Sequence, residues 1–238
     1  MLYLVPTPLG NLEDCTARAL RALREARAVY CEDTRRTRGL LSHFGIHTPT
    51  FRYDERDARG IEKILERLRS GEDLALVSDS GTPVISDPGA RLVAAARREG
   101  IPVTSLPGPS AVAAAVAGSG LPGDSFVFLG FLPRAPGKRS KLIAEAAALG
   151  RTVALYESPF RVVDLLETVV QTLGPETQVA LARELSKLHE EWLFGSAAQL
   201  LEQLRSRKEI LGEFVVMIGP VRQGHGQHHD SEPAEAEG

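Results

Sequence analysis

The sequence predicts an α/β protein with two domains, from three observations. Short apolar runs alternate with segments whose apolar residues recur at helical spacing, a pattern typical of parallel strands with helices on both faces. Residues 118–124 hold three glycines and one proline, which favours a boundary there. After it, consecutive strands follow with short links. With 238 residues, 43% of them hydrophobic, the chain is long enough for two cores.

The first domain, residues 1–119, is predicted to hold a mostly parallel sheet with flanking helices. Ile61, Ile64, Leu65 and Leu68 are separated by three, four and seven positions, so they form one apolar helix face. Around that helix, strands are expected at 2–5, 28–31, 74–78 and 103–106, and helices at 14–26, 34–43, 91–99 and 110–119.

The second domain, residues 120–222, is predicted to hold a mixed sheet, because strands that follow one another with short links pair antiparallel. Strands are expected at 126–131, 152–156, 179–185, 190–194 and 214–218, with helices near 138–148 and 160–172. Residues 223–238 have four acids, no lysine or arginine and no large apolar residue, which predicts a disordered tail. Its histidines at 225, 228 and 229 either bind metal adventitiously or are simply solvated.

The composition excludes several classes of protein. No run of about 18 apolar residues is present to span a bilayer, and residues 1–5 lack the basic flank of a signal peptide, so we expect a cytoplasmic location without membrane contact. Cys15 and Cys31 form no Cys-x-x-Cys pair, which argues against a disulfide framework and a zinc site. We therefore predict no metal.

Small and polar residues gather where the predicted strands end. In open α/β sheets, ligands bind beyond the carboxyl ends of strands, so these segments predict a small-molecule crevice between the domains. No phosphate-binding Gly-rich motif, nucleophile elbow or His-Glu-x-x-His motif accompanies them. The strand-end segments are 6–11, 32–35, 79–89, 107–110, 156–159 and 183–184.

Each of these segments also has a purely structural interpretation. Asp79 either accepts hydrogen bonds from a ligand or orders its own loop. Ser110 stands where a helix cap belongs, a position that also presents free N–H groups. The charged run 32–38 is either a site or a solvated helix start. Around Pro133 and Pro136, a basic cluster either contacts a polyanion or is ordinary surface; it comprises Arg134, Lys138, Arg139 and Lys141.

Seven motifs, in this order along the chain, resemble the tetrapyrrole methylase superfamily, and in particular its members that methylate small-subunit ribosomal RNA. The resemblance covers about residues 1–220 and implies a two-domain class III methyltransferase fold. The motifs are Leu-Val-Pro-Thr-Pro-Leu-Gly-Asn-Leu at 4–12, Cys-Glu-Asp-Thr-Arg at 31–35, Val-Ser-Asp-Ser-Gly-Thr-Pro at 77–83, Ser-Asp-Pro-Gly at 86–89, Leu-Pro-Gly-Pro-Ser at 106–110, Gly-Phe-Leu-Pro at 130–133 and Tyr-Glu-Ser-Pro at 156–159.

The resemblance implies S-adenosylmethionine as methyl donor, bound between the domains, and a homodimer. It also implies the reaction: 2′-O-methylation of the ribose of a cytidine in the decoding region of 16S ribosomal RNA, within the small ribosomal subunit. Carried over by position, the cofactor-binding residues are Pro6, Leu9, Asp79, Thr82, Ser110 and Ala111 in the first domain, and Tyr156, Ala182 and Glu213 in the second. Where the superfamily has a glycine-rich first loop, this chain has Pro-Thr-Pro-Leu-Gly at 6–10.

Methyl transfer from a sulfonium is a direct displacement, so correct positioning supplies much of the catalysis. Because a ribose hydroxyl is only weakly acidic, a base or a cation assists. We predict that Glu184 or Glu157 supports the hydroxyl and that Arg35 holds a phosphate. Further candidates at the crevice are the acceptor Asp33 and the cations Arg183 and Lys187.

Two other functions remain open at this point. A methylase of a small tetrapyrrole-like substrate shares the same cleft but requires a large apolar pocket, while only 5% of the residues are aromatic. A non-enzymatic ribosome-binding factor requires the same loops without a cofactor. A nucleotide hydrolase requires clustered metal-binding carboxylates that these loops do not offer.

Overall fold

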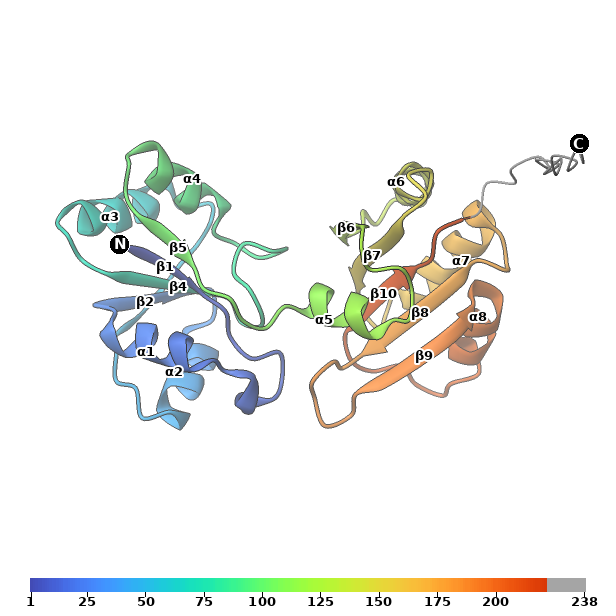
Figure 1. Ribbon diagram of the computed structural model, residues 1–238, viewed down its shortest axis with the longest axis horizontal. Coiled ribbons are helices and arrows are strands. Elements are labelled where there is room, and N and C mark those ends of the chain that lie inside the picture. The colour runs from blue at the N-terminus through green and yellow to red at the C-terminus, as the bar shows by residue number, and fades with distance from the viewer. Residues whose placement is uncertain (222–238) are drawn as a thin grey trace, which may run out of the picture.

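The structure, a computed structural model, describes residues 1–221 and has two lobes with one five-stranded sheet each (Figure 1). We call residues 1–110 the N-terminal lobe and residues 111–221 the C-terminal lobe. The tail predicted at 223–238 lies outside the described residues. The predicted fold class, two α/β units with a parallel first sheet and a mixed second sheet, is confirmed.

The N-terminal sheet is parallel throughout, in the order β3-β2-β4-β1-β5. Helices α1 and α2 cover one face and α3 and α4 the other (Figure 1), each over its own apolar core. The strands are β1 (Leu2–Val5), β2 (Ala28–Cys31), β3 (Thr50–Arg52), β4 (Leu74–Val77) and β5 (Val103–Ser105). The helices are the 3₁₀ turn η1 (Leu12–Asp14), α1 (Ala17–Glu25), α2 (Thr34–His43), α3 (Ala58–Arg69) and α4 (Ala90–Arg98).

The C-terminal sheet is mixed, in the order β6-β7-β10-β8-β9, with only β6 and β7 parallel. Helices α6, α7 and α8 bury one face in the largest core of the described chain. The elements are α5 (Ala111–Gly118), β6 (Phe126–Phe131), α6 (Pro136–Ala147), β7 (Thr152–Glu157), α7 (Val162–Leu173), β8 (Gln178–Arg183), β9 (Glu191–Ser196), α8 (Ala197–Arg205) and β10 (Phe214–Ile218).

Helix α5 is the only helix on the other face of that sheet within residues 1–221. Its apolar residues Val112, Ala115 and Val116 pack on the strands, and Gly118 lets it approach β9 closely, since a Cβ there would lie 2.6 Å from the Trp192 ring. In its packing α5 therefore belongs with the second sheet, although it precedes the domain boundary predicted at residue 119. The domain boundary at residue 119 stays a prediction.

Three local features were not expected from the sequence. Strand β3 is only three residues long and partly exposed, so it shows no apolar run. The helix expected from residue 14 begins at Ala17, because the Thr16 hydroxyl caps the Ala19 N–H and residues 12–14 form a separate 3₁₀ turn. Helix α8 was not expected from the sequence, and it starts with a capping box between Ser196 and Gln199.

Within residues 1–221, no helix is long and apolar enough to cross a membrane. The same residues contain no group of three or more histidine, cysteine, aspartate or glutamate side chains arranged to hold a metal ion.

A candidate active site between the two sheets

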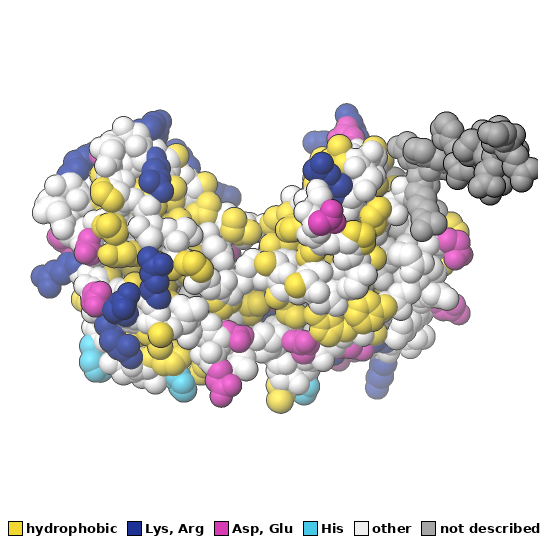
Figure 2. Space-filling view, in the orientation of Figure 1, with side chains coloured by type: hydrophobic (Ala, Val, Ile, Leu, Met, Phe, Trp, Pro, Cys, Tyr) yellow, Lys and Arg dark blue, Asp and Glu magenta, His cyan; other side chains and the backbone are white. Residues whose placement is uncertain are grey.

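A cavity of about 360 Å³ lies between the lobes, at the carboxyl ends of the N-terminal strands and beside the start of α5. Its volume falls within the range of about 300–1,000 Å³ found for small-molecule sites. Figure 2 shows the molecule hollowed between the lobes, with hydrophobic side chains on both walls. The two sheets build its walls in different ways.

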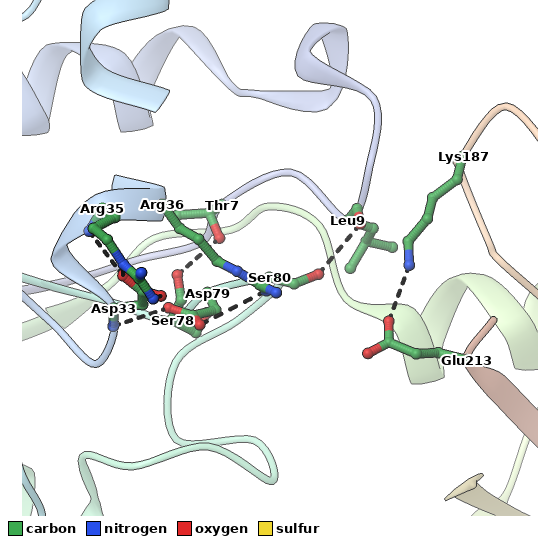
Figure 3. Close-up of polar contacts among 10 residues, drawn as sticks. All are labelled: Thr7, Leu9, Asp33, Arg35, Arg36, Ser78, Asp79, Ser80, Lys187 and Glu213. Atoms are coloured by element: carbon green, nitrogen blue, oxygen red, sulfur yellow. Dashed lines mark hydrogen bonds and ion pairs between the residues drawn. The ribbon is translucent and has the colours of Figure 1, made fainter. Parts of the chain in front are cut away.

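Three loops of the N-terminal lobe are joined into one wall. The backbones of Thr7 and Gly81 exchange two hydrogen bonds, of 2.9 and 3.0 Å, which join the loops after β1 and β4. The Thr82 hydroxyl donates to the Pro109 carbonyl at 2.8 Å, which adds the loop after β5. The hydroxyl of Ser80 reaches the carbonyl of Leu9 at 3.4 Å (Figure 3). The wall is therefore positioned before any ligand binds.

Gly81 is required at the centre of this wall. Its φ of +80° lies in the left-handed region, and a Cβ at this position would lie 3.2 Å from the Leu9 side chain. A side chain here would thus strain the backbone and displace a residue that lines the cavity.

Asp79 stands at the end of β4, where the sequence placed it, and connects to the start of α2. Its carboxylate accepts the Asp33 N–H at 3.3 Å and lies 3.8 Å from the Arg36 guanidinium (Figure 3). Arg35 points elsewhere: it pairs with Asp33 at 3.2 Å, its side chain is 87% exposed, and it does not line the cavity. Arg36, not Arg35, is the arginine of this helix that lines the cavity.

Asp87 lines the cavity from the irregular loop between β4 and α4. Burial, together with the negative charges of Glu32 and Asp79, raises the pKa of Asp87 to about 6. Neither ion pairs nor hydrogen bonds are formed by its side chain within the described chain. Asp87 is therefore a carboxylate that changes its charge close to neutral pH.

Glu55 anchors the far end of this loop at the start of α4. Its carboxylate accepts the Gly89 N–H at 2.6 Å and the Arg91 N–H at 2.8 Å, and the Tyr53 hydroxyl donates to it at 2.6 Å. Burial raises the pKa of Glu55, but these hydrogen bonds together outweigh burial and leave it below its usual value. An ionised Glu55 thus holds the backbone next to Asp87 in place.

The start of α5 presents N–H groups to the cavity. The Ser110 side chain makes no capping hydrogen bond, and Ser110 and Ala111 both line the cavity. The first N–H groups of a helix lack intrahelical partners and carry partial positive charge. This end of α5 is therefore suited to a carboxylate or another electron-rich group of a ligand.

The C-terminal wall is a row of side chains across the sheet rather than a set of loops. The strand register places Phe131 beside Tyr156, Tyr156 beside Val215, and Val215 beside Ala182. All four line the cavity. Burial raises the pKa of Tyr156, so its hydroxyl stays protonated near neutral pH. This face is free to line a cavity because only the short helix α5 covers it.

Glu184, Lys187 and Glu213 form a paired cluster at the edge of the cavity. The Lys187 ammonium lies 2.8 Å from Glu184 and 3.0 Å from Glu213, as Figure 3 shows for the second pair. Glu184 also accepts the Glu213 N–H at 2.9 Å. Burial raises the pKa of Glu184, yet Lys187 and this N–H outweigh burial and lower it overall.

The Lys187 side chain also packs directly on Gly10 of the N-terminal lobe, so closely that a Cβ on Gly10 would overlap it. The Ser186 hydroxyl next to it donates to Asp14. Glu157 also lines the cavity but is almost fully buried, and it accepts the Ser158 N–H at 2.8 Å and lies 3.3 Å from Arg161.

The structure brings most of the predicted site residues together around this cavity. Those that line it are Leu9, Asp79, Thr82, Ser110, Ala111, Tyr156, Glu157, Ala182, Glu184 and Glu213. Pro6 stands behind the wall against Gly108, and Arg183 is paired with Glu191. Ile85 and Asp87 lie in the predicted strand-end segment 79–89 but were not singled out, while Phe131 and Val215 were missed as lining residues. Asp87 lies within the quoted Ser-Asp-Pro-Gly motif and Phe131 within Gly-Phe-Leu-Pro, so the motifs held a signal for both.

The two-lobe α/β fold, with a small-molecule cavity between a parallel and a mixed sheet, is the class III methyltransferase arrangement that the resemblance implied, and the comparisons with known proteins agree. Residues 1–201 match the family described as Tetrapyrrole (Corrin/Porphyrin) Methylases. The chain belongs to this family, in the branch of the ribosomal RNA small subunit methyltransferases I.

Several curated relatives carry that branch name, and three of them illustrate the similarity. The protein from Hydrogenobaculum is 46% identical over 91% of this chain and 94% of its own length. The protein from Thermotoga maritima is 43% identical over 91% of this chain and 97% of its own. The protein from Escherichia coli O157:H7 is 42% identical over 99% of this chain and 82% of its own.

Solved structures share the fold at low identity. Uroporphyrin-III C-methyltransferase from Thermus thermophilus, in complex with S-adenosylhomocysteine, has a TM-score of 0.64 at 19% identity, over 92% of this chain and 97% of that one. The cobalt precorrin-4 methyltransferase of cobalamin biosynthesis has a TM-score of 0.66, also at 19%, over 92% and 94%. At this identity the similarity concerns the fold alone.

Proposed function

We propose that this methyltransferase transfers a methyl group from S-adenosylmethionine to the ribose 2′-hydroxyl of a cytidine in the decoding region of 16S ribosomal RNA. The branch name of the relatives, small subunit ribosomal RNA methyltransferase, supports the substrate. The single structural observation that supports it best is the cavity between the lobes, with carboxylates and free helix N–H groups on its walls.

The residues around the cavity fit S-adenosylmethionine, which supplies a methyl group on a positively charged sulfur. The open N–H groups at the start of α5 suit its carboxylate. Carboxylates along the walls, among them Asp79 and Glu213, suit its ammonium and sulfonium charges. Apolar residues that line the cavity, among them Leu9, Ala182 and Val215, suit its adenine ring.

Among the carboxylates of the cavity, Asp87 suits the role of base better than either glutamate predicted from the sequence. Glu184 is already paired with Lys187, and Glu157 is engaged with Ser158 and Arg161. Asp87 has no such partner, and a base is most effective when its pKa lies near the working pH.

In the proposed step, Asp87 accepts the proton of the 2′-hydroxyl as the O–H bond breaks. The ribose oxygen then forms a bond to the methyl carbon while the bond from that carbon to sulfur breaks, which leaves S-adenosylhomocysteine. Lys187, held by Glu184, provides a cation at the edge of the cavity. We propose that Arg35, exposed on α2, contacts a phosphate of the RNA outside the cavity.

The two glutamates are tested directly against this assignment. Glu184→Gln and Glu157→Gln are both expected to keep binding S-adenosylhomocysteine, measured by calorimetry. If either loses turnover as completely as Asp87→Asn does, that glutamate is the base and Asp87 is not.

We further propose that the substrate is an assembled or partly assembled small subunit, because each lobe is small and shape recognition requires more surface than a hairpin offers. Equal transfer to a hairpin and to intact subunits would contradict this. The cytoplasmic location and the homodimer implied by the resemblance are proposals as well, and light scattering on the purified protein tests the dimer.

The function is tested by transfer of radiolabelled methyl to small subunits purified from a strain that lacks this enzyme. Label at one cytidine whose 3′ linkage resists alkaline cleavage is the expected result, because a methylated 2′-oxygen cannot attack the neighbouring phosphate. Label on a base, or none despite binding of the donor, would contradict the proposal and favour a small-molecule acceptor.

A further inference from the structure

Phe131 occupies an unusual position for a large apolar side chain: it lines the cavity, yet it is 60% exposed. The residue stands at the end of β6, an edge strand of the C-terminal sheet. Two other residues of β6, Val127 and Leu129, point to the opposite face of the sheet and pack against the core there.

A β-bulge aims Phe131 at the cavity. Phe128 and Phe131 are three residues apart along β6, whereas their partners Ala154 and Tyr156 are only two residues apart along β7. The extra residue is accommodated at Gly130, whose φ is +61°. Because side chains alternate between the faces of a strand, an unbulged register would have turned Phe131 toward the helix-covered face.

The ring is held in a defined orientation by its neighbours. Phe131 packs against Tyr156 with ring centroids 5.5 Å apart, and Tyr156 packs edge-on against Phe128 at 4.9 Å. Aromatic side chains with two rotatable bonds lose little entropy when they bind, so this arrangement is suited to hold a flat partner.

The opposite lobe places an apolar side chain on the same cavity. Ile85, 42% exposed, lines it from the loop after β4. That loop contacts the bulge itself, since a Cβ on Gly130 would lie 2.7 Å from the Ser86 hydroxyl oxygen. Apolar groups from both lobes therefore flank the cavity close to Phe131.

Exposure increases along the row toward solvent, because α5 packs on Ala182 and Val215 but not on Phe131. Ala182 is fully buried and Val215 is 5% exposed, whereas Phe131 is 60% exposed. Under the proposed function, the methyl donor binds next to the start of α5. Phe131 stands at the mouth, where a nucleotide that is still part of an RNA chain must enter.

We propose that Phe131, supported by Tyr156, is the stacking surface for the base of the target nucleotide. This inference rests on the proposed function. A ribose inside a stacked helix cannot enter a closed cavity, and RNA-binding proteins commonly splay such nucleotides out and stack their bases on aromatic rings. Because every base has a π-face, Phe131 positions the nucleotide without specifying its identity.

The test compares Phe131→Ala with Phe194→Ala. Phe194 is a matched control, since it is 57% exposed on the same sheet but lies on the opposite edge strand and does not line the cavity. We expect Phe131→Ala to lower kcat/KM for small subunits by about 5- to 100-fold, the usual effect of losing one base-stacking contact. The dissociation constant of S-adenosylhomocysteine should change less than twofold, and Phe194→Ala should retain wild-type kcat/KM.

Two further variants separate stacking from apolar filling. Phe131→Tyr should retain the wild-type kcat/KM, because tyrosine keeps a π-face. Phe131→Leu should lower kcat/KM as Phe131→Ala does, because leucine has none. The inference is overturned if Phe131→Leu is as active as wild type, if Phe194→Ala loses as much as Phe131→Ala, or if Phe131→Ala weakens S-adenosylhomocysteine binding in proportion to its activity. Failure of the wild-type enzyme to methylate subunits would instead overturn the proposed function.

Discussion

The two lobes build the two walls of one cavity by different means. In the N-terminal lobe all strands are parallel, so their carboxyl ends meet at one edge, and the site residues lie in loops beyond the core. In the C-terminal lobe the site residues Tyr156, Ala182 and Val215 lie within strands and also pack on α5. Side-chain changes in the first wall should therefore affect mainly binding and chemistry, whereas side-chain changes in the second wall should affect stability as well.

The largest expected effect, on the chemistry of the N-terminal wall, comes from Asp87→Asn. Removal of a general base slows turnover by about 10²- to 10⁴-fold. S-adenosylhomocysteine binding should be preserved and the melting temperature should not fall, because Asp87 lies in a loop outside the cores. Single-turnover methylation of small subunits measures the rate. Asp124→Asn, an exposed change elsewhere, serves as control.

The pH dependence of the rate sharpens the same point. With the pKa of Asp87 near 6, the wild-type single-turnover rate should rise with pH through about 6 and level off above it. The residual rate of Asp87→Asn should lack this rise. An unchanged pH profile in the variant would show that another group is the base.

The next largest effect comes from Gly81→Ala in the N-terminal wall. Comparison with Gly71→Ala separates the cost of backbone strain from the effect on the shape of the site. Gly81→Ala should destabilise the protein by about 1–2 kcal/mol through its positive φ, and it should weaken S-adenosylhomocysteine binding because the new Cβ pushes on Leu9. Gly71→Ala is the matched control: its φ is +90°, but nothing lies within 4 Å. It should lose similar stability and no affinity, as thermal melting and calorimetry would show.

A third pair of variants tests whether the C-terminal wall combines both roles. Val215→Ala removes two buried carbons, which should cost about 1.5 kcal/mol of stability and also weaken S-adenosylhomocysteine binding. Val216→Ala, on the opposite face of the same strand, should cost at least as much stability without loss of affinity. If Val215→Ala loses affinity at unchanged stability, the comparison between the lobes fails.

The smallest effect concerns stability and pH. The pKa of Asp87 in the folded state lies above its unfolded value, so ionisation of Asp87 lowers the free energy of unfolding. This loss of stability is absent at low pH, develops between about pH 4 and 6, and is complete above pH 6. Asp87→Asn should thus melt at the wild-type temperature at pH 4 and slightly higher at pH 8. A lower melting temperature at pH 8 would show that the ionised carboxylate has a stabilising partner.

Much of the fold was predictable because its signals are local. Apolar spacing marked the helix around Ile61 and Leu68, and the apolar run before Asp79 marked β4 and its loop. Strand β3 was missed because three partly exposed residues carry no such signal. The joining of the loops at Gly81 and Thr82 depends on backbone contacts between distant segments, which no local pattern encodes.

At the site, the residue types were predictable and their directions were not. Arg35 and Arg36 are neighbours in one charged run, yet only Arg36 lines the cavity, because successive helix positions point about 100° apart. Glu184 looked like a free acceptor in the sequence, but Lys187 and the Glu213 N–H already occupy it.

The sequence by itself determined most of the strands and helices, the class of the two sheets and the loops that form the site, since each follows from periodicity and turn residues along the chain. Only the tertiary structure decided which side chains share the cavity. The bulge at Gly130 that turns Phe131 and the burial that raises the pKa of Asp87 both arise from contacts between segments far apart in sequence. Strand register and desolvation are properties of packed neighbours, so they exist only once the chain has folded.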